Sequence, residues 1–572
     1  MTKRLIALLL SLVMLLGCLI GCGEKDDEIS NIAEEGSEKT ITLSMYLMSE
    51  EKVSDEQALA IQNAVNKITK SKFKTQLILH YFTEDEYYLA LEKAYDDSLS
   101  AGVPSEGDAL EGETGSETAE ETYVDEYGVV QLKYPTIPDY QVDIFYLSGY
   151  DKLSEYIEYE MVQDLSTDVD NSSKVLKSYI HPSALGGVDS VCNGLYAIPA
   201  NGPIGEYTYM LLNKQILKEY NHTANDFSSV LCQNAQYLLD HVSKYNEEFV
   251  PFRSFTGGNV LDIANVGYIG VDDKGEFNSS NFSIVGSPCK SGERPASQII
   301  FNNADYNKDL RTLVSYKEKG YYGTEADANK PFAMGYIKGG LEVVEQYGDD
   351  YEIVVAEAPT LNTMDLFQNM FAVSSYSSSL SRSMQILSYL YTNKDFNNLL
   401  LYGIEGENYE FVNSEELDEN GKPYQLVKPM PNNQYVMAPE KLGNMLLANP
   451  TVGQSPKLFE MYKQQNIDAL TSPLMGMVHN FDNLPLLDEY NEYLREKSKE
   501  VLAGLLAVNT VEEFDTYFNS MRNDLNADAK LQKAVSSAPI PTVPEEGGDP
   551  VDSYTIAGVY TYWLKTVTES AE

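Results

Sequence analysis

The sequence predicts an α/β protein of two doubly wound lobes that crossing segments join, with extra helices at the C-terminus. From Thr40 onward, short apolar runs alternate with stretches of helical periodicity, which is the pattern of strands and helices in such a lobe. About 530 residues follow Lys39, too many for a single hydrophobic core. Two segments, Leu195–Tyr209 (LYAIPANGPIGEYTY) and Glu357–Leu361 (EAPTL), are the expected crossings between the lobes.

The first 22 residues are predicted to be a lipoprotein signal peptide. Lys3 and Arg4 precede an apolar run, Leu5–Leu16, that is too short to span a bilayer as a mature helix. Two Gly-Cys pairs follow, ending at Cys18 and Cys22, and each resembles the lipobox of bacterial lipoproteins, where the cysteine is acylated. We expect lipidation at Cys22, with Cys18 as the alternative, because the charged sequence GEKDDE begins directly after Cys22. Ordinary secretion with incidental cysteines is the competing interpretation.

Residues 23–39 are polar, acidic and aperiodic, which is typical of a tether. The predicted first lobe comprises residues 40–200 and 365–450. The predicted second lobe comprises residues 201–364 and 451–572.

The first lobe opens with a strand–helix–strand–helix pattern that leads to a third strand. The expected elements are a strand at Thr40–Leu47, a helix that Ser54 and Gln57 cap, a strand at Lys74–Tyr81, a helix at Glu84–Leu99 and a strand at Val142–Leu147. A second helical pattern begins at Leu153, so the third strand ends in a tight loop at a helix entrance.

Residues 100–127 interrupt this lobe. The segment holds nine acidic residues, no Lys or Arg, and many Gly, Ser and Thr residues, so we interpret it as a disordered surface insertion. A calcium site is the alternative that its acid count raises, but no EF-hand spacing is present.

The second lobe begins with a strand at Glu206–Asn213. The further elements expected in it are helices at 215–220 and 227–245, a hairpin turn at 271–275, a helix at 306–319 and a strand at 351–356. After the return crossing, Phe371–Tyr402 predicts a strand and two helices. Thr471–Leu525 is helical with a break between Pro473 and Pro485, and a second loose loop is expected at Pro541–Asp552.

Charge and cysteine content limit the possible functions. The chain has 87 acidic and 41 basic residues, and its net charge of −46 becomes −48 when Lys3 and Arg4 leave with the signal. A chain with this much negative charge is not expected to bind nucleic acid or to dock on an anionic lipid surface. Three scattered cysteines, Cys192, Cys232 and Cys289, form neither a disulfide framework nor a zinc site. We expect buried free thiols, with one disulfide as the alternative.

No catalytic motif is present. The sequence lacks GxSxG, HExxH, GxxxxGK[ST] and GxGxxG, and its five histidines have no ligand-like spacing. We therefore expect no enzyme activity, no metal and no cofactor, and we expect the histidines to be structural.

Several segments, in their order along the chain, resemble the family 1 extracellular solute-binding proteins of bacterial ABC importers. They are DIFYLSGYDKLSEYIEYEMVQDLS from Asp143, GLYAIPAN from Gly194, YMLLNKQILKEYN from Tyr209, Phe371–Phe411 and SPLMGMVHNF from Ser472. The resemblance implies a type II periplasmic-binding-protein-like fold in which Phe371–Tyr402 returns to the first lobe. It also implies a monomer on the extracellular face of the membrane that binds a carbohydrate, specifically an oligosaccharide, between its lobes. Closure of the lobes would present this ligand to ABC permease subunits.

The candidate ligand residues lie at strand ends and crossings, because ligands of open α/β sheets bind beyond the carboxyl ends of strands. A sugar needs aromatic faces for its apolar side and polar groups for its hydroxyls. The candidates are Tyr46, Met48 and Glu50 after the first strand, Ser148, Gly149 and Tyr150 after the third, Asn201 and Tyr207 beside the first crossing, Arg253 and Phe255 in PFRSFTGG, and Tyr376 after the return strand. Each of the 42 tyrosines also has a purely structural interpretation, and Arg253 has many acids to pair with.

Two other classes of function stay open. The chain is alternatively a surface lipoprotein that acts as an adhesin or as the partner of a sensor. It is also compatible with a surface glycoside hydrolase, which needs two carboxylates facing each other across a cleft.

Overall fold

The structure is a computed structural model. It describes residues 40–101, 122–124, 130–132, 138, 140–171, 174–255, 260–265, 268–271, 277–279, 282–288, 298–418, 420–431, 433–472, 475–476, 487–534, 540–542 and 551–553. The predicted signal peptide, the tether and the two candidate lipidation sites, Cys18 and Cys22, lie outside these residues, as does most of the predicted insertion at 100–127.

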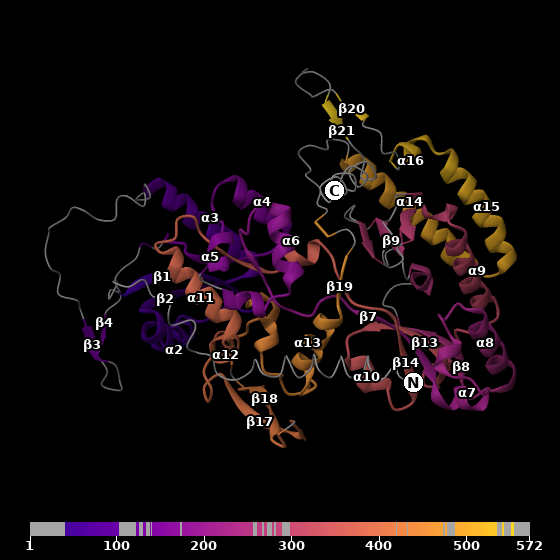
Figure 1. The fold of residues 1–572 in the computed structure, drawn as a ribbon, viewed down its shortest axis with the longest axis horizontal. Coiled ribbons are helices and arrows are strands. Elements are labelled where there is room, and N and C mark those ends of the chain that lie inside the picture. Colours follow the sequence, from indigo (N-terminus) through magenta and orange to yellow (C-terminus); the bar gives the residue numbers. More distant parts are fainter. Residues whose placement is uncertain are drawn as a thin grey trace.

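The first lobe is built on a five-stranded sheet (Figure 1). In spatial order its strands are β2 (Thr75–Thr83), β1 (Ile41–Ser49), β5 (Ile144–Leu147), β16 (Met370–Val373) and β6 (Ile198–Pro199). Strands β2 and β5 pair parallel with β1, as the strand–helix alternation predicts, whereas β16 pairs antiparallel with both β5 and β6. The reason is that β6 leads the chain out toward the second lobe and β16 leads it back.

Helices cover both faces of this sheet, and their apolar sides fill one core. They are α2 (Asp55–Phe73), α3 (Glu84–Ala101), α4 (Tyr150–Glu158), α5 (Ser166–Asn171), α6 (Pro182–Cys192), α11 (Leu380–Thr392), α12 (Lys394–Tyr402) and α13 (Leu458–Asp468). Ser54 is the N-cap of α2, and its side chain accepts a hydrogen bond from Gln57 N at 3.3 Å. Gly403 ends α12 with a φ of 81°, a conformation that favours glycine.

The second lobe holds a four-stranded mixed sheet in the order β14 (Tyr351–Glu357), β7 (Tyr207–Asn213), β13 (Phe332–Gly339) and β8 (Val250–Ser254). A smaller sheet pairs β10 (Phe277–Ser279), β9 (Tyr268–Val271), β11 (Val285–Pro288) and β12 (Gln298–Ile299). Strands β9 and β10 are antiparallel, as the predicted hairpin requires, although the turn itself lies outside the described residues.

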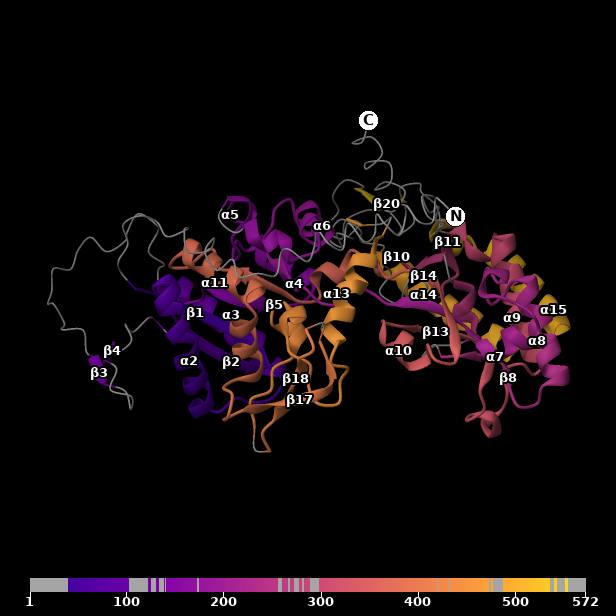
Figure 2. The same cartoon turned by 60° about the horizontal axis from the view of Figure 1, so that its bottom comes forward.

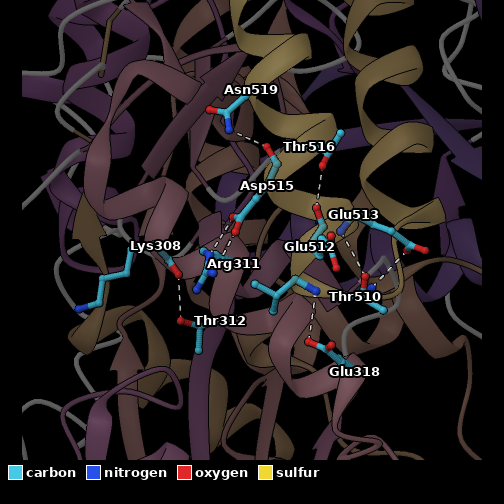
Figure 3. Close-up of polar contacts among 11 residues, drawn as sticks. Lys308, Arg311, Thr312, Glu318, Thr510, Glu512, Glu513, Asp515, Thr516 and Asn519 are labelled. Carbon is cyan, nitrogen blue, oxygen red and sulfur yellow. Dashed lines mark hydrogen bonds and ion pairs between the residues drawn. The ribbon is translucent and has the colours of Figure 1, made fainter.

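The C-terminal helices belong to the second lobe (Figures 1 and 2). The helices of this lobe are α7 (Lys214–Glu219), α8 (Gln233–Tyr245), α9 (Ala304–Glu318), α10 (Glu342–Tyr347), α14 (Leu487–Ala507), α15 (Val511–Ala527) and α16 (Ala529–Ala534). Figure 3 shows α9 and α15 side by side, with an ion pair between Arg311 and Asp515. Beneath it, Phe518 of α15 packs against Phe301 in the lobe core.

In the part of the chain that the structure describes, three segments cross between the lobes. The first joins β6 to β7, the second joins β14 to β16, and the third follows α13. The second and third crossings pair as short parallel strands, β15 (Thr360–Leu361) and β19 (Leu470–Thr471). Gly205 of the first crossing lies against them, because a Cβ added there would meet Thr360 at 3.0 Å. The predicted two-lobed α/β fold with crossing segments is thus the observed one.

The packing departs from the predicted division at α13. Phe459 of this helix is buried in the core of the first lobe, whereas the division predicted from the sequence assigned residues 451–572 to the second. The chain therefore leaves the first lobe at the end of α13, about twenty residues later than expected.

Three two-stranded pairs do not follow from the sequence patterns. They are β17 (Tyr409–Leu417) with β18 (Pro423–Pro429), β3 (Thr122–Val124) with β4 (Val130–Leu132), and β20 (Ile540–Thr542) with β21 (Val551–Ser553). The last pair forms the ends of the segment expected to be a loose loop, so that expectation is wrong at its ends.

Cys192 and Cys232 are half-buried free thiols, and Cys289 lies outside the described residues. In the part of the chain that the structure describes, no helix is both long and apolar enough to cross a bilayer. The described residues contain no group of three or more His, Cys, Asp or Glu side chains placed to hold a metal ion.

Candidate ligand-binding site

A cavity of about 460 Å³ lies where the first and second crossings leave the first lobe, and we call it the interlobe cavity. Its volume falls within the range of roughly 300–1,000 Å³ that is usual for small-molecule sites. Its lining comprises Ile180, His181, Ala184, Pro199, Ala200, Asn201, Gly202, Pro203, Ile204, Gly205, Glu206, Leu361, Asp365, Leu366, Gln368, Asn369, Glu440 and Met445. Figure 1 shows α6 and β19, which flank this region, between the two lobes.

Strand direction brings these residues together. Strands β1, β2, β5 and β6 all run toward the second lobe, so their carboxyl ends share the edge at which the first crossing begins. Strand β16 runs the opposite way, so its amino end lies at that same edge. Gln368 and Asn369, which immediately precede β16, are therefore in the cavity wall.

His181 occupies the entrance to α6 and also lines the cavity. Its Nδ1 accepts a hydrogen bond from Ser183 N at 3.3 Å, which places the hydrogen of a neutral imidazole on Nε2. Burial lowers the pKa of His181, so the ring is neutral at pH 7. Its structural role as a helix cap agrees with the expectation, and the residue also lines the cavity.

Asp365 and Gln368 form a connected polar pair in the wall. Asp365 Oδ2 accepts a hydrogen bond from Asn362 N at 2.8 Å, and Asp365 Oδ1 accepts one from Gln368 Nε2 at 3.2 Å. Burial raises the pKa of Asp365, and the hydrogen bonds from Asn362 partly offset this. Asn369 Oδ1 accepts a hydrogen bond from Tyr146 Oη at 2.6 Å. The wall therefore presents oriented amides beside a carboxylate.

Among the predicted candidates, Asn201 lines the cavity. Its side-chain amide donates to Tyr179 O at 2.6 Å and to Asn444 Oδ1 at 3.0 Å. Its backbone N–H donates to Gly443 O at 2.7 Å, and its carbonyl accepts from Met445 N at 3.0 Å. Asn201 thus fixes the first crossing to the segment that carries Met445.

Ser148, Gly149 and Tyr150 lie directly behind the cavity wall. Ser148 Oγ donates to Gln368 O at 2.6 Å, and Gly149 N donates to Phe367 O at 2.6 Å. The Tyr150 ring packs edge-on against Phe367, with ring centroids 5.1 Å apart. These residues position the wall and are not themselves among its lining residues.

The candidates after the first strand are placed otherwise. Tyr46 and Met48 are buried in the core of the first lobe, and Tyr46 stacks on His80 with ring centroids 4.5 Å apart. Glu50 is exposed and forms an ion pair with Lys441 at 2.9 Å, next to Glu440 of the cavity lining.

The candidates in the second lobe lie outside the lining as well. Tyr207 is buried and donates to Asp468 Oδ2 at 2.6 Å. Arg253 donates to Asp327 O at 2.9 Å and lies over the ring of Phe332 at the start of β13, which is the end of the sheet remote from the first crossing. Phe255 packs against Phe332 with ring centroids 5.4 Å apart.

Tyr376 lies at the far edge of the first lobe. It follows β16, and because β16 is antiparallel its carboxyl end points away from the second lobe. The ring of Tyr376 packs against Tyr95 there, with centroids 6.1 Å apart. Tyr376 was a candidate because it follows the return strand, and the antiparallel direction of β16 places that end of the strand away from the crossings.

The expected aromatic lining is also not observed. Among the described lining residues, the imidazole of His181 is the only aromatic ring. Tyrosines are instead the largest fully buried side chains of the described part. Their hydroxyls reach backbone carbonyls, as when Tyr391 donates to Ile198 O at 2.8 Å and Tyr316 to Val230 O at 2.7 Å. The high tyrosine content therefore reflects the packing of the hydrophobic cores and not an aromatic ligand site.

Sequence reasoning missed His181, Gln368 and Asn369 as cavity residues. A signal for the last two was present, because they stand between the return crossing EAPTL and the strand FAVSS. A search confined to the carboxyl ends of strands passes over them.

Two α/β lobes, three crossings and a polar cavity beside the crossings define the fold class of two-lobed extracellular solute-binding proteins. No protein-family model matches the chain. Its sequence is 21% identical over 376 residues to a curated carbohydrate ABC transporter substrate-binding protein of Streptococcus pneumoniae, covering 62% of this chain and 68% of that relative.

A solved structure of a solute-binding protein has the same fold. The N-glycan transport solute binding protein NgtS of Streptococcus pneumoniae aligns with a TM-score of 0.50 and 17% identity, over 86% of this chain and 96% of that chain. An extracellular solute-binding protein of Bifidobacterium longum subsp. infantis aligns over 86% of this chain and 95% of that chain, at 14% identity and a TM-score of 0.43. The resemblance to the extracellular solute-binding proteins that the sequence motifs predict is confirmed.

Proposed function

We propose that this protein captures a carbohydrate, specifically an oligosaccharide, in the interlobe cavity and delivers it to the permease of an ABC importer. The observation that carries the proposal is the position of the cavity, which lies where the first and second crossings leave the first lobe and is lined by residues of both crossings. A ligand held there contacts the segments about which the lobes move, so its binding energy can favour a closed arrangement.

The chemistry of the wall supports a polyhydroxylated ligand. Carboxylates accept hydrogen bonds from hydroxyls, amides both donate and accept, and a neutral imidazole donates. Glu206, Glu440, Gln368, Asn369 and His181 supply these groups beside apolar patches at Ile180 and Met445. The name of the sequence relative, a carbohydrate ABC transporter substrate-binding protein, supports the same ligand class.

A thermal-shift screen against mono- and oligosaccharides, with oligopeptides alongside, tests this function. A ligand at a hundredfold excess over its Kd adds about 2.7 kcal/mol to stability. In a protein of this size the expected result is a rise of a few degrees in Tm with one family of glycans. A rise in Tm with peptides alone would show that the ligand is a peptide and not a carbohydrate. The absence of any shift would favour the adhesin or sensor-partner alternative.

We further propose that the protein is a monomeric binding protein and not a glycoside hydrolase. Glu206, Asp365 and Glu440 lie in one cavity, so hydrolysis deserves a direct measurement. Incubation with the saccharide that gives the thermal shift should leave it intact, as chromatography of the products would verify. Accumulation of shorter sugars that Glu440→Gln abolishes would establish the enzyme instead.

We also propose that Cys22 carries a lipid that holds the protein on the extracellular face of the membrane. The apolar run and the Gly-Cys pair at its end support this. In cells fed an alkyne fatty acid, labelling should disappear in Cys22→Ala and persist in Cys18→Ala. Labelling lost only in Cys18→Ala would move the site to Cys18.

A further inference from the structure

The charges around the interlobe cavity have one sign. Three acidic residues, Glu206, Asp365 and Glu440, line it, and no described lining residue is a lysine or an arginine. His181 adds no positive charge at pH 7, because its burial lowers its pKa and its ring stays neutral.

The lysine next in sequence to the lining does not offset these charges. Lys441 follows Glu440, but its Nζ lies 2.9 Å from Glu50 Oε1 and 3.6 Å from Glu84 Oε2. Its side chain is only 16% exposed, so it is held against these two carboxylates. One lysine between two acids leaves this edge of the first lobe negative as well.

Among the described residues, no lysine or arginine pairs with the acidic residues of the cavity lining. Asp365 is satisfied by neutral donors, the backbone and side chain of Asn362 and the amide of Gln368. In the described part of the chain, no lysine or arginine forms an ion pair with Glu206 or Glu440, and both residues are exposed. Their oxygens are therefore available to accept hydrogen bonds from a ligand.

An uncharged sugar and an acidic sugar differ sharply at such a wall. A sugar hydroxyl donates to a carboxylate, and the bond is charge-assisted. A ligand carboxylate at the same place has no proton to donate and adds a like charge, whose repulsion grows as closure removes water. The net charge of −46 adds a long-range field of the same sign.

We propose that the interlobe cavity selects uncharged saccharides and rejects acidic ones, and that Glu206 and Glu440 are the residues that set this specificity. The proposal rests on the carbohydrate function proposed above and names the chemical class within it. Glu206 belongs to the first crossing and Glu440 to the first lobe, so the discrimination acts on both the hinge side and the lobe side of the ligand.

The test is calorimetric titration of the protein with matched pairs of sugars that differ in one kind of group. Suitable pairs are mannotriose with trimannuronate and galactotriose with trigalacturonate, in which a carboxylate replaces the CH2OH group of each ring. For a pair whose neutral member binds, the acidic member should bind at least about tenfold more weakly, equivalent to about 1.4 kcal/mol. This difference in affinity between the neutral and the acidic sugar should increase at low ionic strength.

Two double variants distinguish the effect of the acidic residues in the cavity wall from the effect of the protein's net charge. Glu206→Gln/Glu440→Gln replaces both carboxylates by amide groups of similar size. The ratio between the Kd values of the acidic and the neutral sugar should therefore fall severalfold. Glu158→Gln/Glu512→Gln makes the same change in net charge at exposed positions on α4 and α15, and should leave this ratio as it is.

Each outcome is decisive. Equal or tighter binding of the acidic member overturns the charge selection while leaving the carbohydrate function standing. A ratio that the Glu206→Gln/Glu440→Gln variant does not alter overturns the role of these two residues. Failure of every saccharide, neutral or acidic, to bind overturns the proposed function itself, and the inference with it.

Discussion

The hydroxyl of Tyr207 donates a hydrogen bond to Asp468 Oδ2 at 2.6 Å. Tyr207 begins β7 just after the first crossing, and Asp468 ends α13 just before the third. This bond therefore ties together two segments that are 261 residues apart at the junction of the lobes. Burial, followed by the hydrogen bond to Asp468, raises the pKa of Tyr207, so the hydroxyl keeps its proton throughout the physiological range.

Tyr207→Phe should loosen this junction at small cost in stability. Asp468 is exposed and regains water when the hydroxyl is lost, so the expected loss is about 0.5–1.5 kcal/mol. The measurement is thermal unfolding combined with single-molecule energy transfer between dyes on the two lobes. Cysteines at Leu59 of α2 and Tyr245 of α8 are suitable, because both side chains are more than half exposed. An unchanged melting temperature together with an unchanged distance distribution would show that the bond does not restrain the lobes.

Asn466 makes a second and stronger connection at the same place. Its Oδ1 accepts from Ile204 N and its Nδ2 donates to Gly202 O, both at 2.8 Å. Asn466→Ala removes both bonds and leaves the largely buried Ile204 N–H without its acceptor, so we expect a loss of about 1–3 kcal/mol and a broader distribution of interlobe distances.

The neighbouring residue supplies a control for that experiment. Ile467 lies one position further along α13 and is 72% exposed. Ile467→Ala should change neither the melting temperature nor the distance distribution. If Ile467→Ala and Asn466→Ala change stability and the distance distribution alike, the change is due to any substitution in α13 and not to the loss of the hydrogen bonds between Asn466 and the first crossing.

Stability should depend on pH through Asp309 of α9. Burial, with a smaller contribution from Asp305, raises the pKa of Asp309 to about 6, above the value of about 3.9 for the unfolded chain. Between these two pKa values the folded protein keeps a proton on Asp309 that the unfolded chain has lost. The free energy of unfolding is therefore highest at low pH and falls as the pH rises through about 6. Asp309→Asn should thus be more stable than the parent at pH 8, by about 1 kcal/mol after allowance for solvent screening, and equal to it at pH 4.

Thermal unfolding of the two proteins between pH 4 and pH 8 measures this difference. Asp524→Asn on α15, where the side chain is exposed, controls for the change in net charge. A difference between Asp309→Asn and the parent that stays constant across the range would contradict the assigned titration.

The docking of α15 onto the rest of the second lobe should depend on apolar packing far more than on its ion pair with α9. Arg311 and Asp515 meet in a bidentate pair, with Nε–Oδ1 at 2.8 Å and Nη2–Oδ2 at 3.0 Å, but both side chains are about half exposed (Figure 3). Arg311→Ala should cost about 0.2–1 kcal/mol. Phe518→Ala, which empties a buried position against Phe301 and Phe514, should cost about 3–5 kcal/mol. Urea unfolding compares the two, and equal losses would refute this ranking.

Asn201 and Gln368 line the same cavity but should respond differently to truncation. The Asn201 amide is engaged by Tyr179 and Asn444 and the residue is 8% exposed, so Asn201→Ala should lower stability by about 1–3 kcal/mol. Gln368 is exposed, so Gln368→Ala should leave stability within about 0.5 kcal/mol and weaken saccharide binding. Parallel melting and titration experiments separate the effects, and a stable Asn201→Ala would refute the structural role.

Local patterns in the sequence determine the elements of this fold. Alternation predicts β1, helical spacing after Ser54 predicts α2, and the apolar run before Ser148 predicts β5, because each signal is carried by residues only a few positions apart. The crossing at Asn201 and the return at Glu357–Leu361 follow from where those patterns stop. The two-lobed α/β architecture was therefore predictable from the sequence.

The cavity was decided by contacts that no local pattern encodes. The antiparallel direction of β16 places Asn369 in the cavity wall and Tyr376 at the opposite edge, and this direction follows from pairing with β5 more than two hundred residues earlier. The tyrosine count likewise cannot distinguish a ring that faces a sugar from one that, like Tyr391, is buried with its hydroxyl on a backbone carbonyl. Periodicity reports which face of an element is buried, whereas the tertiary pairing of distant strands decides which ends of those elements meet.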